Sequence, residues 1–139
     1  MIVQIIGLPG SGKTTLANEL VKIFNAVHLN ADKVREFVNY DLGFSHEDRI
    51  ENARRLGGVA RLLDHQGLNV VVDFVCPTFE TRLAFGEPHI LVWVDRIKVG
   101  RYEDTNTLWQ DPICFKGVHI VDGLTVEEEV NLVLERVKA

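Results

Sequence analysis

Residues 7–14 read Gly-Leu-Pro-Gly-Ser-Gly-Lys-Thr, which is a complete G-x-x-x-x-G-K-T phosphate-binding loop. An apolar stretch, Ile2–Ile6, precedes this loop, and a segment with helical character, Lys13–Phe24, follows it. Such loops surround phosphates with backbone N–H groups, and the N-terminus of the next helix adds partial positive charge. The strand–loop–helix context therefore predicts a binding site for a nucleoside triphosphate.

The loop pattern also predicts individual roles. Lys13 is expected to reach the β- and γ-phosphates of ATP and to act as a catalytic residue. The Thr14 hydroxyl is expected to ligate Mg²⁺. The predicted ATP-binding residues are Gly7, Leu8, Pro9, Gly10, Ser11, Gly12, Lys13, Thr14 and Thr15.

Length and composition restrict the class of protein. The 139 residues suffice for one core but not for two, so residues 1–139 are predicted to form a single domain. The formal net charge of −5 disfavours non-specific binding to nucleic acid. No apolar run approaches the roughly 20 residues that span a bilayer, and no signal peptide is expected, because the first strand is predicted to start at residue 2. Cys76 and Cys114 indicate no disulfide framework, so a cytoplasmic protein is expected, and a homodimer is compatible with the sequence.

Strand-like and helix-like segments alternate along the chain. Strands are predicted at residues 2–6, 26–29, 69–75, 89–94 and 118–121, and helices at 13–24, 32–38, 46–65 and 78–85, with N-caps at Ser45 and, for a last helix, at Thr125. This order predicts an α/β fold of the P-loop NTPase type, with three layers and an open, parallel, five-stranded sheet that has helices on both faces. Residues 96–117 show no clear periodicity, and their place after the fourth strand predicts a short lid.

Ligands of open parallel sheets bind beyond the carboxyl ends of the strands. The loops after residues 6, 30, 75 and 95 are therefore expected to surround one crevice. Asp32 and Arg35 follow the second strand, one helical turn apart. Asp32 could orient or deprotonate an attacking hydroxyl, and Arg35 could clamp an anionic group. An acidic residue in the first turn of a helix with an ordinary surface arginine explains the same residues, so both readings stay open.

Two segments carry a more specific pattern. Residues 29–35 read Leu-Asn-Ala-Asp-Lys-Val-Arg, and residues 42–55 read Leu-Gly-Phe-Ser-His-Glu-Asp-Arg-Ile-Glu-Asn-Ala-Arg-Arg. Together with the phosphate-binding loop, they resemble the adenylyl-sulfate kinase family, whose members use MgATP to phosphorylate the 3′-hydroxyl of adenosine 5′-phosphosulfate (APS). The resemblance covers roughly residues 1–95 and implies a kinase with ATP, Mg²⁺ and APS as its ligands.

The resemblance implies roles for residues of the acceptor site. Phe44 would stack on the APS adenine, and Arg35 and Arg49 would hold its anionic groups. Asn52 would hydrogen-bond the ligand, and Asp32 would face the 3′-hydroxyl. An aromatic platform with guanidinium clamps suits an adenine that carries a charged tail. A solvated helix face explains the charged residues around Arg49, but it does not explain Asn52.

The end of the third strand matches the family in part. Phe74 matches a family phenylalanine, which implies a place in the acceptor site. Asp73 stands where the family has a small or polar residue, and Asn30 stands where the family has the first aspartate of its motif. Asp73 is a candidate for the Mg²⁺ site, or else an internal partner for Thr14, Lys13 or a backbone group.

The segment 96–117 departs from the family, which carries a lid rich in lysine and arginine. Arg96, Lys98, Arg101 and Lys116 are the cations here that could act on the transferring phosphoryl group. Trp109 and Phe115 could cap the site or pin the segment to the core. Two alternatives therefore stay open. One is a kinase of another small hydroxyl compound, such as a modified nucleoside or nucleotide, and the other is a nucleotide-binding module with weak catalysis.

Overall fold

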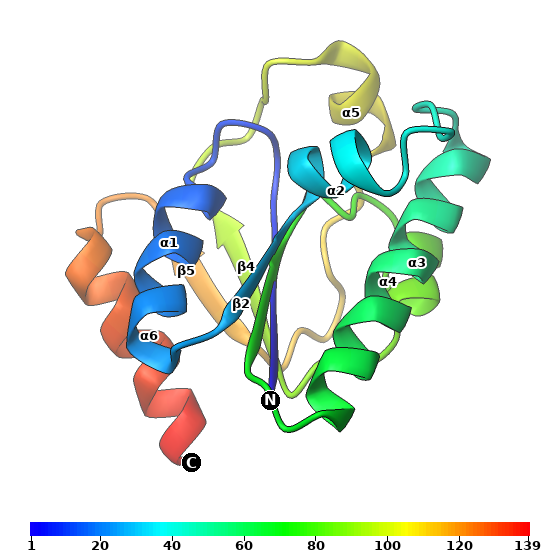
Figure 1. Ribbon diagram of the computed structural model, residues 1–139. Coiled ribbons are helices and arrows are strands. Elements are labelled where there is room, and N and C mark those ends of the chain that lie inside the picture. Colours follow the sequence, from blue (N-terminus) through cyan, green and yellow to red (C-terminus); the bar gives the residue numbers. More distant parts are fainter.

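The computed structural model describes residues 1–139 and has one five-stranded, all-parallel sheet between two layers of helices (Figure 1). The strands are β1 (Ile2–Ile6), β2 (Val27–Asn30), β3 (Val70–Asp73), β4 (Ile90–Asp95) and β5 (Val118–Val121), in the spatial order β2-β3-β1-β4-β5. The helices are α1 (Lys13–Phe24), α2 (Ala31–Phe37), α3 (His46–His65), α4 (Phe79–Phe85), α5 (Glu103–Leu108) and α6 (Val126–Lys138). The predicted three-layer α/β fold is confirmed.

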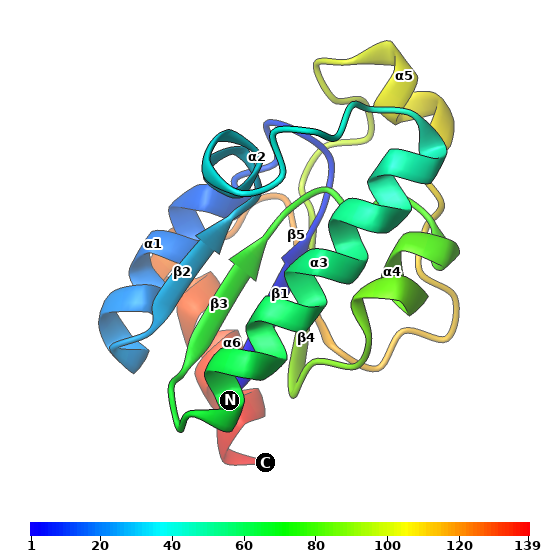
Figure 2. The same ribbon diagram turned by 45° about the vertical axis from the view of Figure 1, so that its right-hand side comes forward.

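The central strand β1 is buried along its whole length and divides the interior into two cores. Val3 and Ile5 pack against α1 and α6, whereas Ile2 and Ile6 pack against α3 and α4 on the opposite face. Figure 2 shows these two pairs of helices on opposite faces of the sheet. Burial on both faces explains why the strand reads as an apolar run rather than as an alternating pattern.

Capping residues set where several helices begin. The Asn30 side chain accepts a hydrogen bond from Lys33 N at 3.2 Å, so β2 runs to residue 30 and α2 starts at residue 31, one residue from the predicted bounds. Ser45 and Thr125 cap α3 and α6 as predicted. No helix combines the length and the apolar character that a membrane span requires.

The structure differs from the sequence analysis in two elements. The third strand covers residues 70–73 rather than 69–75, because the chain leaves the sheet at Phe74 to enter the loop before α4. The segment 96–117 contains the helix α5, which the sequence did not indicate. Six residues are too few to show helical periodicity, so the pattern could not identify this helix.

The neighbouring glycines Gly57 and Gly58 of α3 differ in their surroundings, and this difference predicts opposite effects on stability. A Cβ atom at Gly57 would overlap the Phe85 carbonyl oxygen of α4, whereas a Cβ atom at Gly58 would meet nothing within 4 Å. Gly57→Ala should lower the free energy of unfolding by about 1–3 kcal/mol, because α4 must move. Gly58→Ala should raise it by about 0.5–1 kcal/mol, because alanine favours a helix over glycine. Urea unfolding measures both, and equal stability of the two variants would contradict the packing.

Candidate active site

A cavity of about 580 Å³ opens beyond the carboxyl ends of β1, β2 and β3, beneath α2 and α5. It collects residues from segments that lie far apart in the sequence. The predicted site residues in its wall are Pro9, Gly10, Lys13, Thr14, Asp32, Arg35, Phe44, Arg49, Asn52, Asp73 and Phe74. The other predicted residues of the phosphate-binding loop, which are Gly7, Leu8, Ser11, Gly12 and Thr15, lie outside this wall.

The phosphate-binding loop leads directly into α1. Gly10 and Gly12 have φ angles of 83° and 101°, which other residues rarely adopt. Gly12 is the N-cap of α1, and no side chain caps that end. The first N–H groups of the helix therefore keep their hydrogen-bonding capacity for an anion.

Lys13 lies at the base of the cavity and is 8% exposed. Its Nζ donates a hydrogen bond to the Leu8 carbonyl oxygen at 2.9 Å. Burial lowers the pKa of Lys13 from 10.5 to about 8, although the charges of Asp73 and Asp32 oppose that shift. The lysine is therefore mostly charged at neutral pH and reaches the balance between its charged and neutral forms near pH 8.

This lowered pKa predicts that nucleotide binding takes up protons. Above about pH 8 the free protein holds a largely neutral Lys13, whereas bound phosphates favour the ammonium form. The affinity for nucleotide should therefore fall as the pH rises through 8, by at most about tenfold per pH unit. Calorimetric titration in two buffers of different ionisation enthalpy, at pH 7 and pH 9, measures the uptake. Equal uptake by the wild type and by Lys13→Met would contradict the prediction.

Asp73 is the polar centre beneath the loop and is 2% exposed. Thr14 Oγ1 donates to Asp73 Oδ2 at 2.8 Å, and His28 Nε2 lies 2.6 Å from Asp73 Oδ1. The Asn30 amide donates to both carboxylate oxygens at 3.3 Å. The internal partnership with Thr14 that the sequence left open is therefore present.

Sequence reasoning missed His28 and Asn30 as partners of this carboxylate. The signal lies in the strand register, because Asn30 pairs with Asp73 across β2 and β3, and His28 is two residues earlier on the same face. Two polar residues at alternate positions of a strand, beside a buried aspartate, could have identified the cluster.

The part of the cavity wall that runs from α2 to the first turn of α3 combines one ring with two guanidinium groups. Arg35 Cζ lies 4.4 Å and Arg49 Cζ lies 5.6 Å from the centroid of the Phe44 ring. Arg35 donates to the Gly43 carbonyl oxygen at 2.9 Å, and Arg49 donates to that of Phe44 at 2.9 Å. Burial and the neighbouring Arg49 lower the pKa of Arg35. The two arginines therefore hold the loop before α3 and concentrate positive charge at the cavity wall.

The remaining predicted residues differ in their surroundings. Asp32 is exposed at the cavity and has no side-chain partner, yet its negative charge opposes the lowering of the pKa of both Lys13 and Arg35. Phe74 lines the cavity, but its ring also packs on Phe85 at a centroid distance of 5.5 Å. Burial raises the pKa of the Cys76 thiol to about 12, so this cysteine is an unreactive wall residue.

Arg55 follows Asn52 by three residues, as Asn52 follows Arg49, but it does not share their surroundings. Arg49 and Asn52 line the cavity, but Arg55 does not. Its guanidinium binds Asp41 and Glu51 instead. A step of three residues falls short of a full turn of an α-helix. Two such steps therefore carry Arg55 away from the face of α3 on which Arg49 lies.

The segment after β4 contributes one cation and one carboxylate to the cavity. Arg101 lies against Gly10, and Asp104 of α5 forms a 3.0 Å ion pair with Arg49. The Asn106 side chain braces the turn through two hydrogen bonds to the Gly100 backbone, at 2.7 and 3.1 Å. Four cations were predicted from the sequence as candidates to act on the phosphoryl group, and among these four Arg101 is the one that lines this cavity.

The other lid candidates have different surroundings. Lys98 pairs with Asp95 at 3.0 Å, and Arg96 lies 3.7 Å from the buried Glu129. Trp109 and Phe115 pack against the core formed with α3 and α4 rather than line the cavity. The alternative that these aromatic residues pin the segment to the core is the one that the structure shows.

A phosphate-binding loop beneath a cavity at the carboxyl edge of a parallel sheet places the chain in the class of P-loop nucleotide-binding proteins. The family model for adenylylsulphate kinase matches residues 1–102. The chain belongs to the adenylylsulphate kinase family.

Individual relatives match the N-terminal part of the chain. The probable adenylyl-sulfate kinase of Bacillus subtilis (strain 168) is 43% identical over 86 residues, an alignment that covers 58% of this chain and 44% of that protein. The bifunctional enzyme NodQ of Rhizobium meliloti (strain 1021) is 45% identical over 86 residues, which cover 58% of this chain and 13% of NodQ. The chain therefore spans less than half the length of these relatives.

Solved structures match nearly the whole chain. The Mycobacterium tuberculosis APS kinase CysC, in complex with AMPPNP and APS, superposes with a TM-score of 0.88 at 25% identity, covering 99% of this chain and 97% of that one. A gluconokinase from Sinorhizobium meliloti 1021 shares the fold, with a TM-score of 0.74 at 14% identity and coverage of 98% and 90%.

Proposed function

We propose that this chain transfers the γ-phosphate of ATP to the 3′-hydroxyl of APS. The observation that carries the proposal is the single cavity that joins Lys13 of the phosphate-binding loop to Phe44, Arg35, Arg49 and Asn52. One end of this cavity suits phosphates, and the other suits a purine with an anionic tail. The complex of a structural neighbour with AMPPNP and APS supports the same pair of ligands.

The donor end would hold the triphosphate on the backbone of residues 7–15, with Lys13 against its β- and γ-phosphates. The residues there fit Mg²⁺. Thr14 Oγ1 and the Asp73 carboxylate lie together at the cavity, and both present oxygen atoms, which Mg²⁺ prefers. No group of three or more His, Cys, Asp or Glu side chains could enclose a metal ion, which suits an ion held by one or two protein groups and by phosphates. When bound, Mg²⁺ would neutralise phosphate charge.

The acceptor end would place the hydroxyl in line with the γ-phosphate. Phosphoryl transfer needs mainly positioning and charge stabilisation from the protein. Phe44 would stack on the adenine, Arg35 and Arg49 would hold the anionic groups, and Phe74 would form part of the wall. The negative charge of Asp32 contributes to the pKa values of both Lys13 and Arg35. Asp32 would therefore orient the hydroxyl between the donor end and the acceptor end of the cavity.

We propose further that residues 96–117 act as a short lid over one domain formed by residues 1–139. Arg101 would supply positive charge over the transferring group. Both cysteines are free, which favours a reducing, cytoplasmic location. We propose a homodimer as the assembly, and light scattering tests this proposal.

A transfer assay with γ-labelled ATP, Mg²⁺ and APS at several concentrations tests the function. A labelled product phosphorylated on the 3′-hydroxyl is expected. APS binding without product would indicate a nucleotide-binding module with weak catalysis, and absence of APS binding would indicate another acceptor.

One observation favours the second candidate, a kinase of another small hydroxyl compound. Asp104 places a carboxylate against Arg49, within the wall that would hold the anionic groups of APS. A screen of modified nucleosides and nucleotides, with APS as the reference, separates the two candidates.

The ion pair between Asp104 and Arg49 predicts that neutralising the aspartate strengthens APS binding. Asp104 is 64% exposed on its side chain, so the pair is worth little by itself, about 1 kcal/mol or less. Asp104→Asn would free Arg49 and remove a negative charge from the cavity, which should lower the Kd for APS by about fivefold or less. Calorimetry at low and high salt measures this, and the gain should shrink at high salt. Weaker APS binding by the variant would show that Asp104 contributes to the acceptor site.

A further inference from the structure

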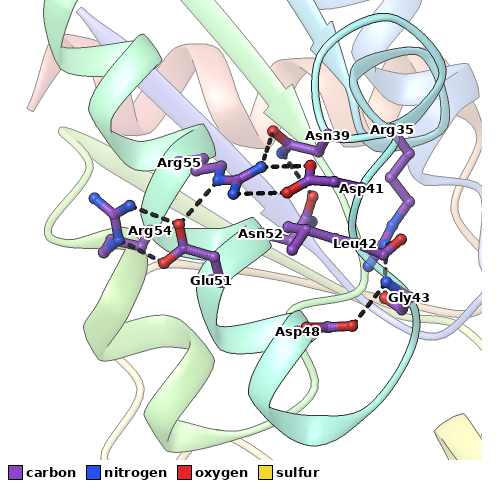
Figure 3. Close-up of polar contacts among 10 residues, drawn as sticks. All are labelled: Arg35, Asn39, Asp41, Leu42, Gly43, Asp48, Glu51, Asn52, Arg54 and Arg55. Atoms are coloured by element: carbon purple, nitrogen blue, oxygen red, sulfur yellow. Dashed lines mark hydrogen bonds and ion pairs between the residues drawn. The ribbon is translucent and has the colours of Figure 1, made fainter.

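At the acceptor end of the cavity, three polar side chains form a hydrogen-bonded chain (Figure 3). This chain runs from Arg55 through Asn39 to Asn52, which lines the cavity. Arg55 Nη1 donates to Asn39 Oδ1 at 3.3 Å, and Asn39 Nδ2 donates to Asn52 Oδ1 at 2.9 Å. Asn39 is completely buried, and Asn52 is 3% exposed while it lines the cavity. Asn39 itself does not line the cavity and lies between α2 and α3.

The direction of this chain follows from the chemistry of its first member. A guanidinium group only donates hydrogen bonds. Asn39 must therefore turn its oxygen toward Arg55 and its nitrogen toward Asn52. Asn52 must then accept through its oxygen, which leaves its NH₂ group without a protein acceptor. An isolated amide could flip by half a turn without any change of shape, so Arg55 is what sets the orientation of both amides.

Arg55 is itself held in place. Its guanidinium binds both Asp41 oxygens, at 2.8 and 3.0 Å, and Glu51 Oε2 at 2.9 Å. Figure 3 shows the Arg55 guanidinium between these two carboxylates, with Asn39 beside it. An arginine remains protonated in proteins, so the direction of the chain does not change with pH.

We propose that Arg55 and Asn39 are positioning residues that fix the Asn52 amide with its NH₂ group toward the acceptor pocket. The pocket then selects, at this point, a ligand atom that accepts a hydrogen bond, such as a purine ring nitrogen or an anionic oxygen, and disfavours an N–H group, which can only donate. This inference rests on the proposed function, because it assumes that the nucleotide acceptor contacts Asn52.

The variant Asn39→Asp should reverse the orientation of the Asn52 amide, which is the last member of the hydrogen-bonded chain. Its side chain offers two accepting oxygens, so one still binds Arg55 and the other attracts the NH₂ group of Asn52. The Asn52 oxygen then faces the pocket. We expect the Kd for APS to rise by about 10- to 100-fold, because an acceptor would meet an acceptor. The Kd for AMPPNP should stay within about twofold of the wild-type value, since the donor site lies on the phosphate-binding loop.

Arg54 and Arg55 provide a matched pair of variants. Both guanidinium groups bind Glu51, but Arg55 alone reaches Asn39. Arg55→Gln puts an amide in place of the obligate donor, so the orientation of Asn39 and Asn52 is no longer set. APS binding should weaken by about 3- to 10-fold in Arg55→Gln and stay unchanged in Arg54→Gln.

Analogues of the acceptor identify the accepting atom. The loss of affinity caused by Asn52→Ala is measured for adenosine 5′-monophosphate and for its deaza analogues, each of which lacks one ring nitrogen. If the loss disappears with one analogue, the accepting atom is that nitrogen. If the loss persists with every analogue, the accepting atom is an oxygen of the ribose or of the phosphate.

The outcomes separate this inference from the proposed function. If the wild type binds no APS, the proposed function fails and the inference fails with it. If the wild type binds APS and Asn39→Asp binds it equally well, with AMPPNP affinity retained, the positioning role is wrong while the proposed function stands. If Asn39→Asp loses both ligands through unfolding, the arginine pair decides, and equal APS affinity of Arg54→Gln and Arg55→Gln would overturn the inference.

Discussion

Lys13→Ala is expected to abolish phosphate transfer, with a loss in kcat of about 10²- to 10³-fold or more. The ammonium group lies at the base of the cavity, and its Nζ contacts the Leu8 carbonyl oxygen within the loop. From this place it can stabilise the negative charge that develops on the β- and γ-phosphates during transfer. The rate of transfer from γ-labelled ATP to APS at saturating substrates measures the loss.

Lys22 supplies the matched control on the same helix. It is largely exposed and pairs with Glu19 at 3.5 Å, far from the loop residues. Lys22→Ala should therefore turn over at the wild-type rate. Turnover of Lys13→Ala within tenfold of the wild type would contradict the role proposed for Lys13, provided that the variant still folds.

The sequence predicted the layers of the fold well because local patterns determine them. The apolar run of β1 and the loop after it indicate a buried strand and a helix without any long-range information. The cores on the two faces of β1 then follow from the alternation of strands and helices. The position of each of these elements can therefore be predicted locally, although the sheet itself pairs strands that are distant in the sequence, such as Ile2 of β1 with Val70 of β3.

The parts that the sequence did not reveal depend on contacts between distant residues. The helix α5 is six residues long and is tied to the cavity by Asp104, which pairs with Arg49 55 positions away. His28 contacts Asp73 across 45 positions, and Asn39 contacts Asn52 across 13. Propensity and spacing do not encode such partners, because the register of the strands and the path of the loops create them.

The structure also explains an apparent loss in the motif after the second strand. Asn30 stands where the resembled family has an aspartate, so this position lacks the carboxylate of the family motif. Asn30 pairs in register with Asp73 of β3, and the two side chains share hydrogen bonds at 3.3 Å. A carboxylate is therefore present beside Thr14, supplied by the neighbouring strand. Two carboxylates at these adjacent positions would repel each other, so an amide at residue 30 suits an aspartate at residue 73.

Asp32→Asn is expected to lower kcat by about 10²- to 10⁴-fold while the Kd for APS changes by only a few-fold. Asparagine preserves the size of the side chain but cannot accept a proton from the attacking hydroxyl. Asp32 is exposed at the cavity without a side-chain partner, so the fold does not depend on it. Single-turnover transfer and equilibrium binding of APS measure the two quantities separately.

The assay pH decides whether this variant is informative. The Asp32 charge raises the pKa of Lys13, whose value is about 8, so removing that charge lowers the pKa further. Measurements at pH 6.5 to 7 keep Lys13 charged in both proteins and confine the comparison to Asp32. Glu36→Gln is the control on the same helix, because Glu36 is exposed and pairs with Lys33 at 3.2 Å. Equal losses of kcat and of APS affinity in Asp32→Asn would assign Asp32 to ligand binding rather than to the transfer step.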